Sequence, residues 1–278
     1  MRFKTSRGLL YLVLVLVIIF YAAPIFIVIS TSLKTDTQAM TKEFEWIPRP
    51  LIFDQYKTVL NRFPIERWIL NSIIVTTGTV LLVLGVSLPA GYAFARLEFK
   101  GKNFLFGLSL LTIMLPFFAY IPQLYLMFYY LRLINTYMAL IIPLATSGVS
   151  IFLFRQFISQ IPSELDDAAR IDGCNNWQIF TKIIVPLTKP AMVSVIIFTA
   201  IKSWNSLMWP LIVASKDTVK TLPVGLAVNV FAATTGVVRP NPYGVIMAAA
   251  LISIVLPVAL FLILQRYFVQ GIATTGLK

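Results

Sequence analysis

The sequence predicts an all-α integral membrane protein with six transmembrane helices, and two observations lead to this fold class. First, 58% of the 278 residues are hydrophobic, only 12% are charged, and the mean hydropathy is +0.84. A soluble domain carries about 25% charged residues, so this chain has too little polar surface to face water on all sides. Second, charge-free stretches long enough to cross a bilayer, about 20 residues each, recur along the chain.

The expected segments follow these stretches in order. The chain is expected to run through a cytoplasmic N-terminus (1–8), a span (9–30), an external loop (31–67), a span (68–95), a cytoplasmic loop (96–103), a span (104–131), a span (133–155), a cytoplasmic loop (156–189), a span (190–213), an external loop (214–239), a span (240–265) and a cytoplasmic tail (266–278). The first span exceeds the apolar core of a signal peptide, about 7–15 residues, so we expect an uncleaved anchor. Prolines inside the spans, such as Pro116, are expected to kink the helices.

The orientation of the spans follows from the charges of the short segments. Arg2, Lys4 and Arg7 precede the first span without any acid, and a second basic cluster fills residues 96–102. Lys and Arg gather in the short cytoplasmic loops of membrane proteins. Six spans then place both termini and residues 156–189 on the cytoplasmic side.

Composition excludes several classes of function. The chain has no His and a single Cys, Cys174, so neither a metal site nor an internal disulfide is expected. The net charge of +12 suits the faces of a membrane protein, and no basic stripe with interleaved aromatics indicates nucleic acid. No phosphate-binding sequence G-x-x-x-x-G-K-[ST] occurs, and the spans hold no carboxylate for catalysis, so no enzyme is expected.

A polar hairpin, residues 161–190, interrupts the apolar chain. Ser163 is expected to cap a first short helix, with Asp166 completing a capping box. Gly173 suits the left-handed end of that helix, and Asn175 or Asn176 is expected to cap a second helix, residues 177–185, which Pro186 ends. Physics alone leaves two interpretations open: a solvated interfacial hairpin, or a contact surface for a soluble partner.

The spacing of the polar hairpin resembles the EAA motif of bacterial ABC-importer permeases: Glu-Ala-Ala, three residues, Gly, nine residues, Ile-x-Leu-Pro. Here Asp167-Ala168-Ala169 is followed by Gly173 and then by residues 183–186, Ile-Ile-Val-Pro, at the same spacing. Asp167 departs from the motif's Glu, and Val185 departs from its Leu. Asp keeps the charge but is one methylene shorter.

The resemblance covers nearly the whole chain and is closest to the carbohydrate-importing, MalG-like branch of the family. The similar segments are residues 90–101, 133–137, 152–157, 204–210 and 265–271. Arg132 stands where this branch is expected to carry Gly. The resemblance implies a MetI-like permease fold in the bacterial cytoplasmic membrane, with residues 68–265 forming one type-1 permease domain.

The resemblance also implies partners. They are a second homologous permease subunit, a dimer of ATPase subunits that binds ATP and Mg, an extracytoplasmic solute-binding protein, and membrane lipid. This chain itself is expected to hold no cofactor. The residues implied in ATPase coupling are Glu164, Asp167, Ala168, Ala169, Asp172, Gly173, Phe180 and Pro186. The tail from Tyr267 to Lys278 is either a further ATPase contact or a frayed terminus.

Candidate contacts for the transported solute lie in the third and fifth spans. Lys202 is the only ionisable residue well inside a span, and such residues usually serve a function. On a continuous helix, Lys202 would share a stripe with Phe198, Asn205 and Trp209. Tyr120 and Gln123 are further candidates. Rings and amides suit a sugar, although Asn205 and Lys202 can equally hold neighbouring helices together.

The function that the resemblance implies is ATP-driven import of a carbohydrate by alternating access. One alternative is an anionic or polyol solute, such as glycerol 3-phosphate or a sugar acid, because Lys202 is a cation. A more remote alternative is an ion-coupled secondary transporter. That mechanism favours acids inside the spans, whereas all 11 Asp and Glu lie outside them.

Overall fold

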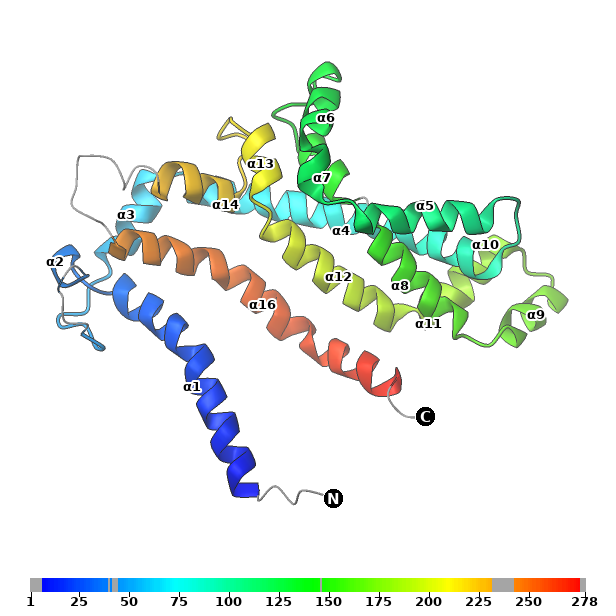
Figure 1. Cartoon of the computed structure of the whole chain (residues 1–278), viewed down its shortest axis with the longest axis horizontal. Helices are drawn as coiled ribbons and strands as arrows, with labels where there is room; N and C mark the ends of the chain where they lie inside the picture. The colour runs from blue at the N-terminus through cyan, green and yellow to red at the C-terminus, as the bar shows by residue number, and fades with distance from the viewer. Residues whose placement is uncertain (1–6, 40, 42–44, 146, 232–242, 276–278) are drawn as a thin grey trace. The chain divides into compact units, whose positions relative to one another are not determined.

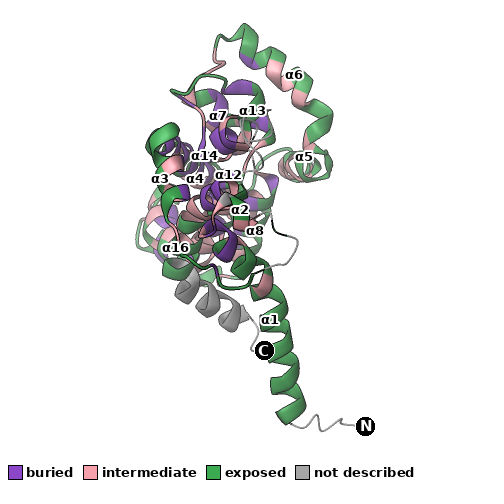
Figure 2. Ribbon diagram, turned by 90° about the vertical axis from the view of Figure 1, so that its left-hand side faces the viewer, coloured by how far each residue is buried: buried purple, intermediate pink, exposed green. Residues whose placement is uncertain are grey.

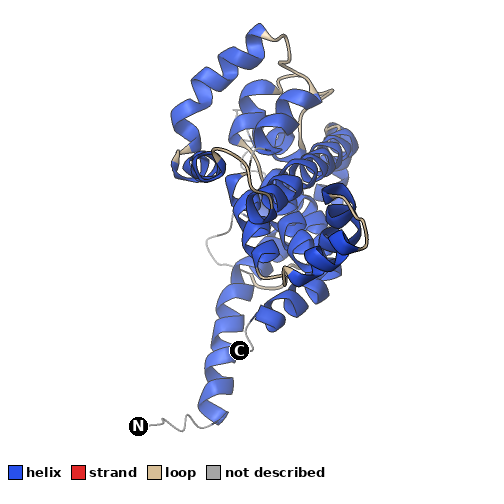
Figure 3. Cartoon of the chain, turned by 90° about the vertical axis from the view of Figure 1, so that its right-hand side faces the viewer, coloured by secondary structure: helices blue, strands red, loops and turns tan. Residues whose placement is uncertain are grey.

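The structure is a computed structural model that describes residues 7–39, 41, 45–145, 147–231 and 243–275, with the backbone alone at residues 7, 36 and 264–275. Within these ranges all regular structure is helical and no strand occurs (Figure 3), which confirms the all-α class. The helices are α1 (Arg7–Ser32), α2 (Asp36–Ala39), α3 (Asp54–Arg62), α4 (Ile65–Arg96), α5 (Lys102–Met114), α6 (Phe117–Tyr130), α7 (Tyr137–Ala145), α8 (Gly148–Ser159), α9 (Glu164–Ile171), α10 (Asn176–Ile179), the π-helix η1 (Phe180–Ile184), α11 (Val185–Leu187), α12 (Lys189–Trp204), α13 (Met208–Val213), α14 (Leu222–Gly225), the π-helix η2 (Leu226–Phe231) and α16 (Tyr243–Thr275). The segment 265–271 and the tail contacts expected from Tyr267 onward lie outside the residues whose side chains are described.

The chain divides into two compact units. Unit 1 comprises Met1–Glu66 and Gly225–Leu256, and unit 2 comprises Arg67–Val224 and Pro257–Lys278. Every residue of the polar hairpin and every candidate solute contact belongs to unit 2.

Unit 1 contains the most apolar helix of the described chain. Residues Gly8–Ser32 have a mean hydropathy of 3.2, and the most apolar stretch of α1 has no buried residue (Figure 2). An apolar helix that is exposed on all sides requires lipid around it.

The segment after α1 forms a hydrogen-bonded cap. Ser30 Oγ donates to the Trp46 carbonyl at 2.8 Å, and the hydroxyls of Ser32 and Tyr56 also lie 2.8 Å apart. Lys34 is buried within this segment, and burial lowers the pKa of its ammonium group while the Glu45 carboxylate acts in the opposite direction. These contacts order part of the segment 31–67, whose external location stays a prediction.

In unit 2, α8 packs against both α5 and α12, while α13 packs against α6 and α7 (Figure 1). The contact of α4 with α8 depends on Gly91. A Cβ atom at this position would lie 2.5 Å from Phe154 Cβ and 3.0 Å from the Arg155 backbone nitrogen. Only a residue without a side chain permits this approach of two helix backbones.

Gly91→Ala is therefore expected to lower the stability of unit 2 by about 1–3 kcal/mol, because the overlap forces one helix away from the other. Thermal unfolding of the purified protein in detergent, followed by circular dichroism, measures this loss. Gly85→Ala is the matched control on the same helix, since a Cβ there meets nothing within 4 Å. The control is expected to unfold at or above the wild-type temperature. Equal melting temperatures for Gly91→Ala and wild type would contradict the close contact.

The third expected span, 104–131, is two helices rather than one kinked helix. Helices α5 and α6 meet at 104°. Leu115 is extended at the break, with φ −79° and ψ 119°, and Pro116 follows it. A residue before proline is pushed out of the helical region, so Pro116 breaks the span here.

The fifth expected span, 190–213, is also divided. Helix α12 ends at Trp204 and α13 begins at Met208. Pro210 is the third residue of α13, where its missing N–H is tolerated, whereas inside a continuous helix its ring would clash with the Ser206 carbonyl. Trp209 therefore does not share one helical stripe with Lys202, and that part of the expectation is wrong, whereas Asn205 still closes α12, with its N–H donating to the Ile201 carbonyl at 3.1 Å.

Three helices of the described chain are long and apolar enough to cross a membrane: Gly8–Ser32, Ile65–Arg96 and Tyr243–Ile263. Up to six spans result when each of three bent helix pairs counts as one. The pairs are α5 with α6, α7 with α8 at 46°, and Asn176–Leu187 with α12 at 73°. The six-span order remains a prediction.

Candidate functional site

The first arm of the polar hairpin is α9, and its start differs from the expectation. Ser163 already has helical backbone angles, φ −69° and ψ −22°, and its side chain makes no capping hydrogen bond. The predicted capping box of Ser163 and Asp166 is therefore wrong. Asp166 is 3% exposed and instead pairs with Arg96 of α4, with Nε and Oδ2 3.1 Å apart. The acid thus turns inward toward the guanidinium of Arg96, which favours its charged form.

The corner between the two arms is held by backbone hydrogen bonds. Gly173 has φ +81°, as its position in the sequence predicts. Its N–H donates to the Arg170 carbonyl at 3.0 Å, and the Cys174 N–H donates to the Ala169 carbonyl at 2.9 Å. This pair of bonds is a Schellman motif, and it satisfies carbonyls at the end of α9. The corner is thus a fixed bend rather than a loose joint.

The second arm begins with the expected Asn cap. Asn175 Oδ1 accepts from the Gln178 N–H at 2.9 Å, and Gln178 Oε1 accepts from the Asn175 N–H at 2.8 Å. The expected end at Pro186 is wrong, because helix continues through η1 and α11 to Leu187. In η1 the Val185 N–H bonds back to the Phe180 carbonyl. This wider turn precedes Pro186, which sits in the first turn of α11 where its missing N–H is tolerated.

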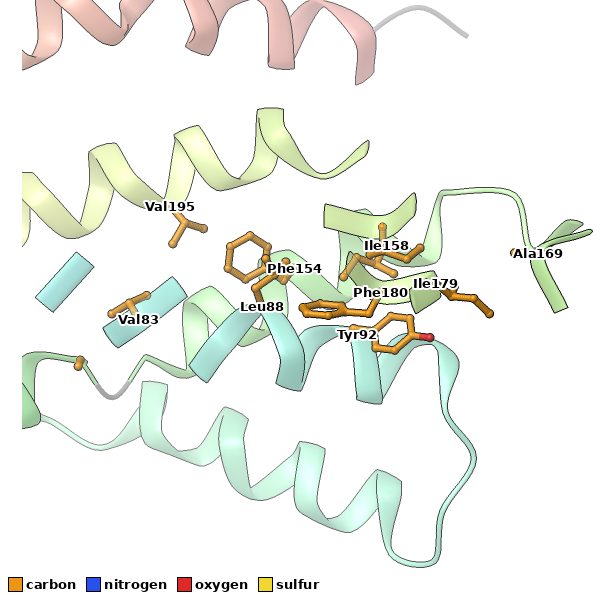
Figure 4. Close-up of a cluster of buried hydrophobic side chains, with 11 residues drawn as sticks. Val83, Leu88, Tyr92, Phe154, Ile158, Ala169, Ile179, Phe180 and Val195 are labelled. Atoms are coloured by element: carbon orange, nitrogen blue, oxygen red, sulfur yellow. The ribbon is translucent and has the colours of Figure 1, made fainter. Parts of the chain in front are cut away.

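A buried cluster fixes the hairpin to α4 and α8 (Figure 4). Ile179 and Phe180 of the second arm lie among Tyr92 of α4 and Phe154 and Ile158 of α8. The rings of Tyr92 and Phe180 are 5.2 Å apart between centroids. Such packing holds the hairpin in one orientation on the helices.

The eight residues implied in ATPase coupling fall into a buried group and an exposed group. Ala169 and Phe180 are buried and pack within the protein. The exposed members are Glu164, Asp167, Ala168, Asp172, Gly173 and Pro186. Ion pairing of Asp167 with Arg170, at 3.3 Å, is local to α9 and exposed. The outer face also carries two large apolar side chains, Ile171 at 87% and Trp177 at 68% exposure.

Sequence reasoning missed Tyr92 and Arg96 as members of this site. The Arg96 guanidinium also donates from Nη2 to the Ile161 carbonyl, just before α9, and the Tyr92 hydroxyl lies 3.3 Å from the Asn176 carbonyl. One signal was available in the sequence: Asp166 and Ala169 are three apart, so they share the inner face of α9. A carboxylate on a buried face needs a partner, and the basic cluster after the second span is expected on the same side of the membrane.

A second feature of unit 2 is a cavity of about 450 Å³. It lies where three helix breaks meet: between α5 and α6, between α7 and α8, and between α12 and α13. Its polar lining residues are Thr112, Tyr120, Ser147, Lys202 and Ser206. Its apolar lining residues are Ile113, Leu115, Phe117, Pro143, Leu144, Gly148, Val149, Leu207, Met208 and Trp209. Small-molecule sites are typically concave, about 300–1,000 Å³ in volume and mostly apolar with a few polar groups.

The structure brings three of the six candidate solute contacts to this cavity: Tyr120, Lys202 and Trp209. Phe198, Asn205 and Gln123 do not line it. Trp209 is largely a packing residue, because it is buried and its Nε1 donates to the Ala139 carbonyl at 2.7 Å. The sequence did not single out Thr112, Ser147 or Ser206, since a lone hydroxyl in an apolar segment gives no signal of its own.

Long apolar helices, broken helices around a cavity with a few polar groups, and a compact polar hairpin together define a membrane transport subunit. Residues 87–274 match the family described as the binding-protein-dependent transport system inner membrane component, and the chain belongs to this family. The protein is thus an ABC importer permease, a transport component rather than an enzyme, in agreement with the expectation from the sequence.

Relatives in bacteria span nearly the full length of the chain. The arabinooligosaccharides transport system permease protein AraQ of Bacillus subtilis is 33% identical, over 100% of this chain and 98% of its own. The same-named protein of Halalkalibacterium halodurans is 36% identical, over 92% of this chain and 90% of its own. The sn-glycerol-3-phosphate transport system permease protein UgpE of Yersinia pestis is 28% identical, over 97% and 98%.

A solved structure shares the fold. The crystal structure of a bacterial ABC transporter involved in the import of the acidic polysaccharide alginate has a chain that superposes with a TM-score of 0.82. The two chains are 22% identical, and the match covers 96% of this chain and 99% of that one. The MetI-like permease fold implied by the sequence is confirmed.

Proposed function

We propose that this permease translocates a carbohydrate, a sugar or an oligosaccharide, across the cytoplasmic membrane by alternating access. The observation that carries the proposal is the cavity of about 450 Å³ at the meeting point of the three helix breaks. Non-helical backbone at membrane depth is tolerated where it lines a cavity or is buried in protein, and discontinuous helices mark solute sites in many transporters.

The lining of the cavity supports a carbohydrate. Phe117 and Tyr120 offer aromatic surface for the C–H faces of a sugar, and their rings are edge to face at 5.3 Å. The hydroxyls of Thr112, Ser147 and Ser206 supply hydrogen-bonding groups of the kind that sugars use. Relatives named for arabinooligosaccharides support the same class of solute.

The energy for transport comes from a separate ATPase. In this proposal the polar hairpin docks on an ATPase dimer that binds ATP and Mg, a second homologous permease completes the path, and an extracytoplasmic binding protein delivers the solute. Both termini and the hairpin lie in the cytoplasm. The exposed Ile171 and Trp177 support a docking role, since large apolar groups on an exposed polar turn mark a contact surface.

A second candidate solute is anionic. Lys202 places an ammonium group at the cavity, and such a cation favours a phosphate or a carboxylate. The relative named for sn-glycerol 3-phosphate supports this class.

Uptake by proteoliposomes tests the proposal. The chain is reconstituted with the second permease, the ATPase and the binding protein encoded beside it, and uptake of labelled arabinooligosaccharide and of sn-glycerol 3-phosphate is measured with and without ATP. ATP-dependent uptake of the oligosaccharide alone supports the first candidate. Uptake that follows an ion gradient without ATP overturns the proposal.

Lys202→Met separates the two solutes further. Loss of a charge-assisted hydrogen bond is expected to reduce uptake of an anionic solute by about tenfold or more, whereas a neutral sugar loses only a few-fold. Initial uptake rates over a range of solute concentrations measure the change. Lys100→Met, an exposed lysine outside the cavity, is the control and is expected to transport as wild type does. Unchanged affinity and rate for both solutes in Lys202→Met would show that Lys202 does not line the path.

A further inference from the structure

We propose that Arg96 is a positioning residue that transmits movement of the polar hairpin to α4, through its contacts with Asp166 and the Ile161 carbonyl. The proposal rests on the proposed function, in which an ATPase moves the hairpin. The proposal concerns the inner side of the hairpin, which contacts α4 and α8, and not the exposed side proposed to dock on the ATPase.

The contacts of Arg96 join the last turn of α4 to the beginning of the hairpin. Arg96 Nε lies 3.1 Å from Asp166 Oδ2, and Nη2 donates to the Ile161 carbonyl. Both side chains of the ion pair are nearly enclosed, at 11% and 4% exposure. Because the guanidinium is planar and rigid, two contacts from one group fix the position of α9 relative to α4.

The same end of α4 also holds the second arm. Tyr92, one helical turn before Arg96, places its hydroxyl 3.3 Å from the Asn176 carbonyl and its ring against Phe180. Residues four apart lie on one face of a helix, so a single face of α4 contacts both arms of the hairpin. With the bend at Gly173 locked, displacement of either arm acts on α4.

The ion pair is poorly suited to a purely stabilising role. Arg96 Nε–H makes no aligned hydrogen bond, and Asp166 Oδ1 is buried without a hydrogen-bond partner among the described residues. A buried pair with incomplete hydrogen bonding recovers little of its desolvation cost, and apolar replacements of similar volume are often neutral or stabilising. What the two charges add is a contact of fixed geometry between α4 and α9.

The experiment compares solute transported per ATP hydrolysed in proteoliposomes that contain the full complex. Asp166→Asn is expected to keep the ATPase bound and active but to lower the transported solute per ATP by about tenfold, the scale of typical coupling between sites. Glu98→Gln is the matched control: it removes the other ion pair near the end of α4, the 2.9 Å contact with Lys102, and is expected to leave the ratio unchanged.

A double variant keeps the proposal testable when an unpaired Arg96 prevents folding. Arg96→Met with Asp166→Leu removes both charges, and we expect wild-type assembly and melting temperature with the same fall in solute per ATP. If the double variant, or a folded Asp166→Asn variant, transports as much solute per ATP as wild type, the inference is overturned. The ion pair then only contributes to packing. Absence of ATP-driven uptake in the wild-type complex itself would overturn the proposed function first, and the inference with it.

Discussion

Replacing Gly173 with valine is expected to uncouple ATP hydrolysis from transport, with solute carried per ATP falling by about tenfold. Gly173 has φ +81°, and a Cβ there would meet nothing within 4 Å. The effect is therefore not steric crowding but the cost of a left-handed backbone, about 1–2 kcal/mol for an ordinary side chain and more for a β-branched one. Relief of this strain breaks the two hydrogen bonds that lock the corner.

Two matched variants isolate this cause. Gly173→Asn is expected to stay near the wild-type ratio, because Asn tolerates the left-handed region. Gly101→Val introduces the same strain at φ +82°, again with no neighbour within 4 Å, but outside the polar hairpin. Its ratio is expected to stay unchanged even if the protein melts at a lower temperature. A wild-type ratio in Gly173→Val would show that the fixed corner is not needed for coupling.

The polar hairpin illustrates what sequence could predict. Gly173 and Asn175 were predictable because local backbone chemistry decides their roles: one accepts a left-handed φ, and the other caps the next helix. Ser163 was predicted by the same kind of rule and failed. Its supposed partner Asp166 is drawn inward by Arg96, 70 residues earlier in the chain. Local rules cannot anticipate a tertiary ion pair.

The spans show the same division between local and tertiary causes. Charge-free stretches located the three long apolar helices of the described residues, because the length of an apolar stretch can be seen in the sequence itself. The break after Met114 was expected only as a kink, and the break after Trp204 was not expected. Whether a proline kinks or breaks a helix depends on the tertiary surroundings of the freed backbone groups, and here the breaks border a cavity lined by residues of six helices. Three of the six candidate solute contacts therefore line the cavity: Lys202, Tyr120 and Trp209. The other three, Phe198, Asn205 and Gln123, do not.

Arg132 has a left-handed backbone at a position where the family resemblance leads us to expect glycine. The MalG-like branch is expected to carry Gly at this position, and the structure gives Arg132 a φ of +56°. The Arg132 N–H donates to the Tyr129 carbonyl at 3.0 Å, whereas the side chain of Asn135, at φ +61°, accepts from the backbone N–H groups of Ser215 and Lys216. A glycine at this position would adopt this φ without the steric cost that a side chain brings.

Ile171→Ala is expected to weaken binding of the ATPase by about 5–30-fold, although the permease itself stays folded. Ile171 is 87% exposed at the end of α9, so its side chain contributes little to the stability of the free chain. At a docked interface the same side chain is buried, and truncation of a central apolar contact typically costs 1–2 kcal/mol or more. The second exposed group, Trp177, is a less clean test, because its ring also packs on Phe180 at 5.4 Å.

Titration of purified ATPase onto the permease in lipid nanodiscs measures the dissociation constant directly. Leu60→Ala on α3 is the matched control: it shortens another exposed apolar side chain, at 54% exposure, in the segment expected to face the opposite side of the membrane. The control is expected to bind the ATPase as wild type does. Equal dissociation constants for Ile171→Ala and wild type would assign docking to the carboxylates of Glu164 and Asp167, which share the exposed face of α9 with Ile171. In that case binding weakens steeply as salt is raised, whereas an apolar contact through Ile171 changes little.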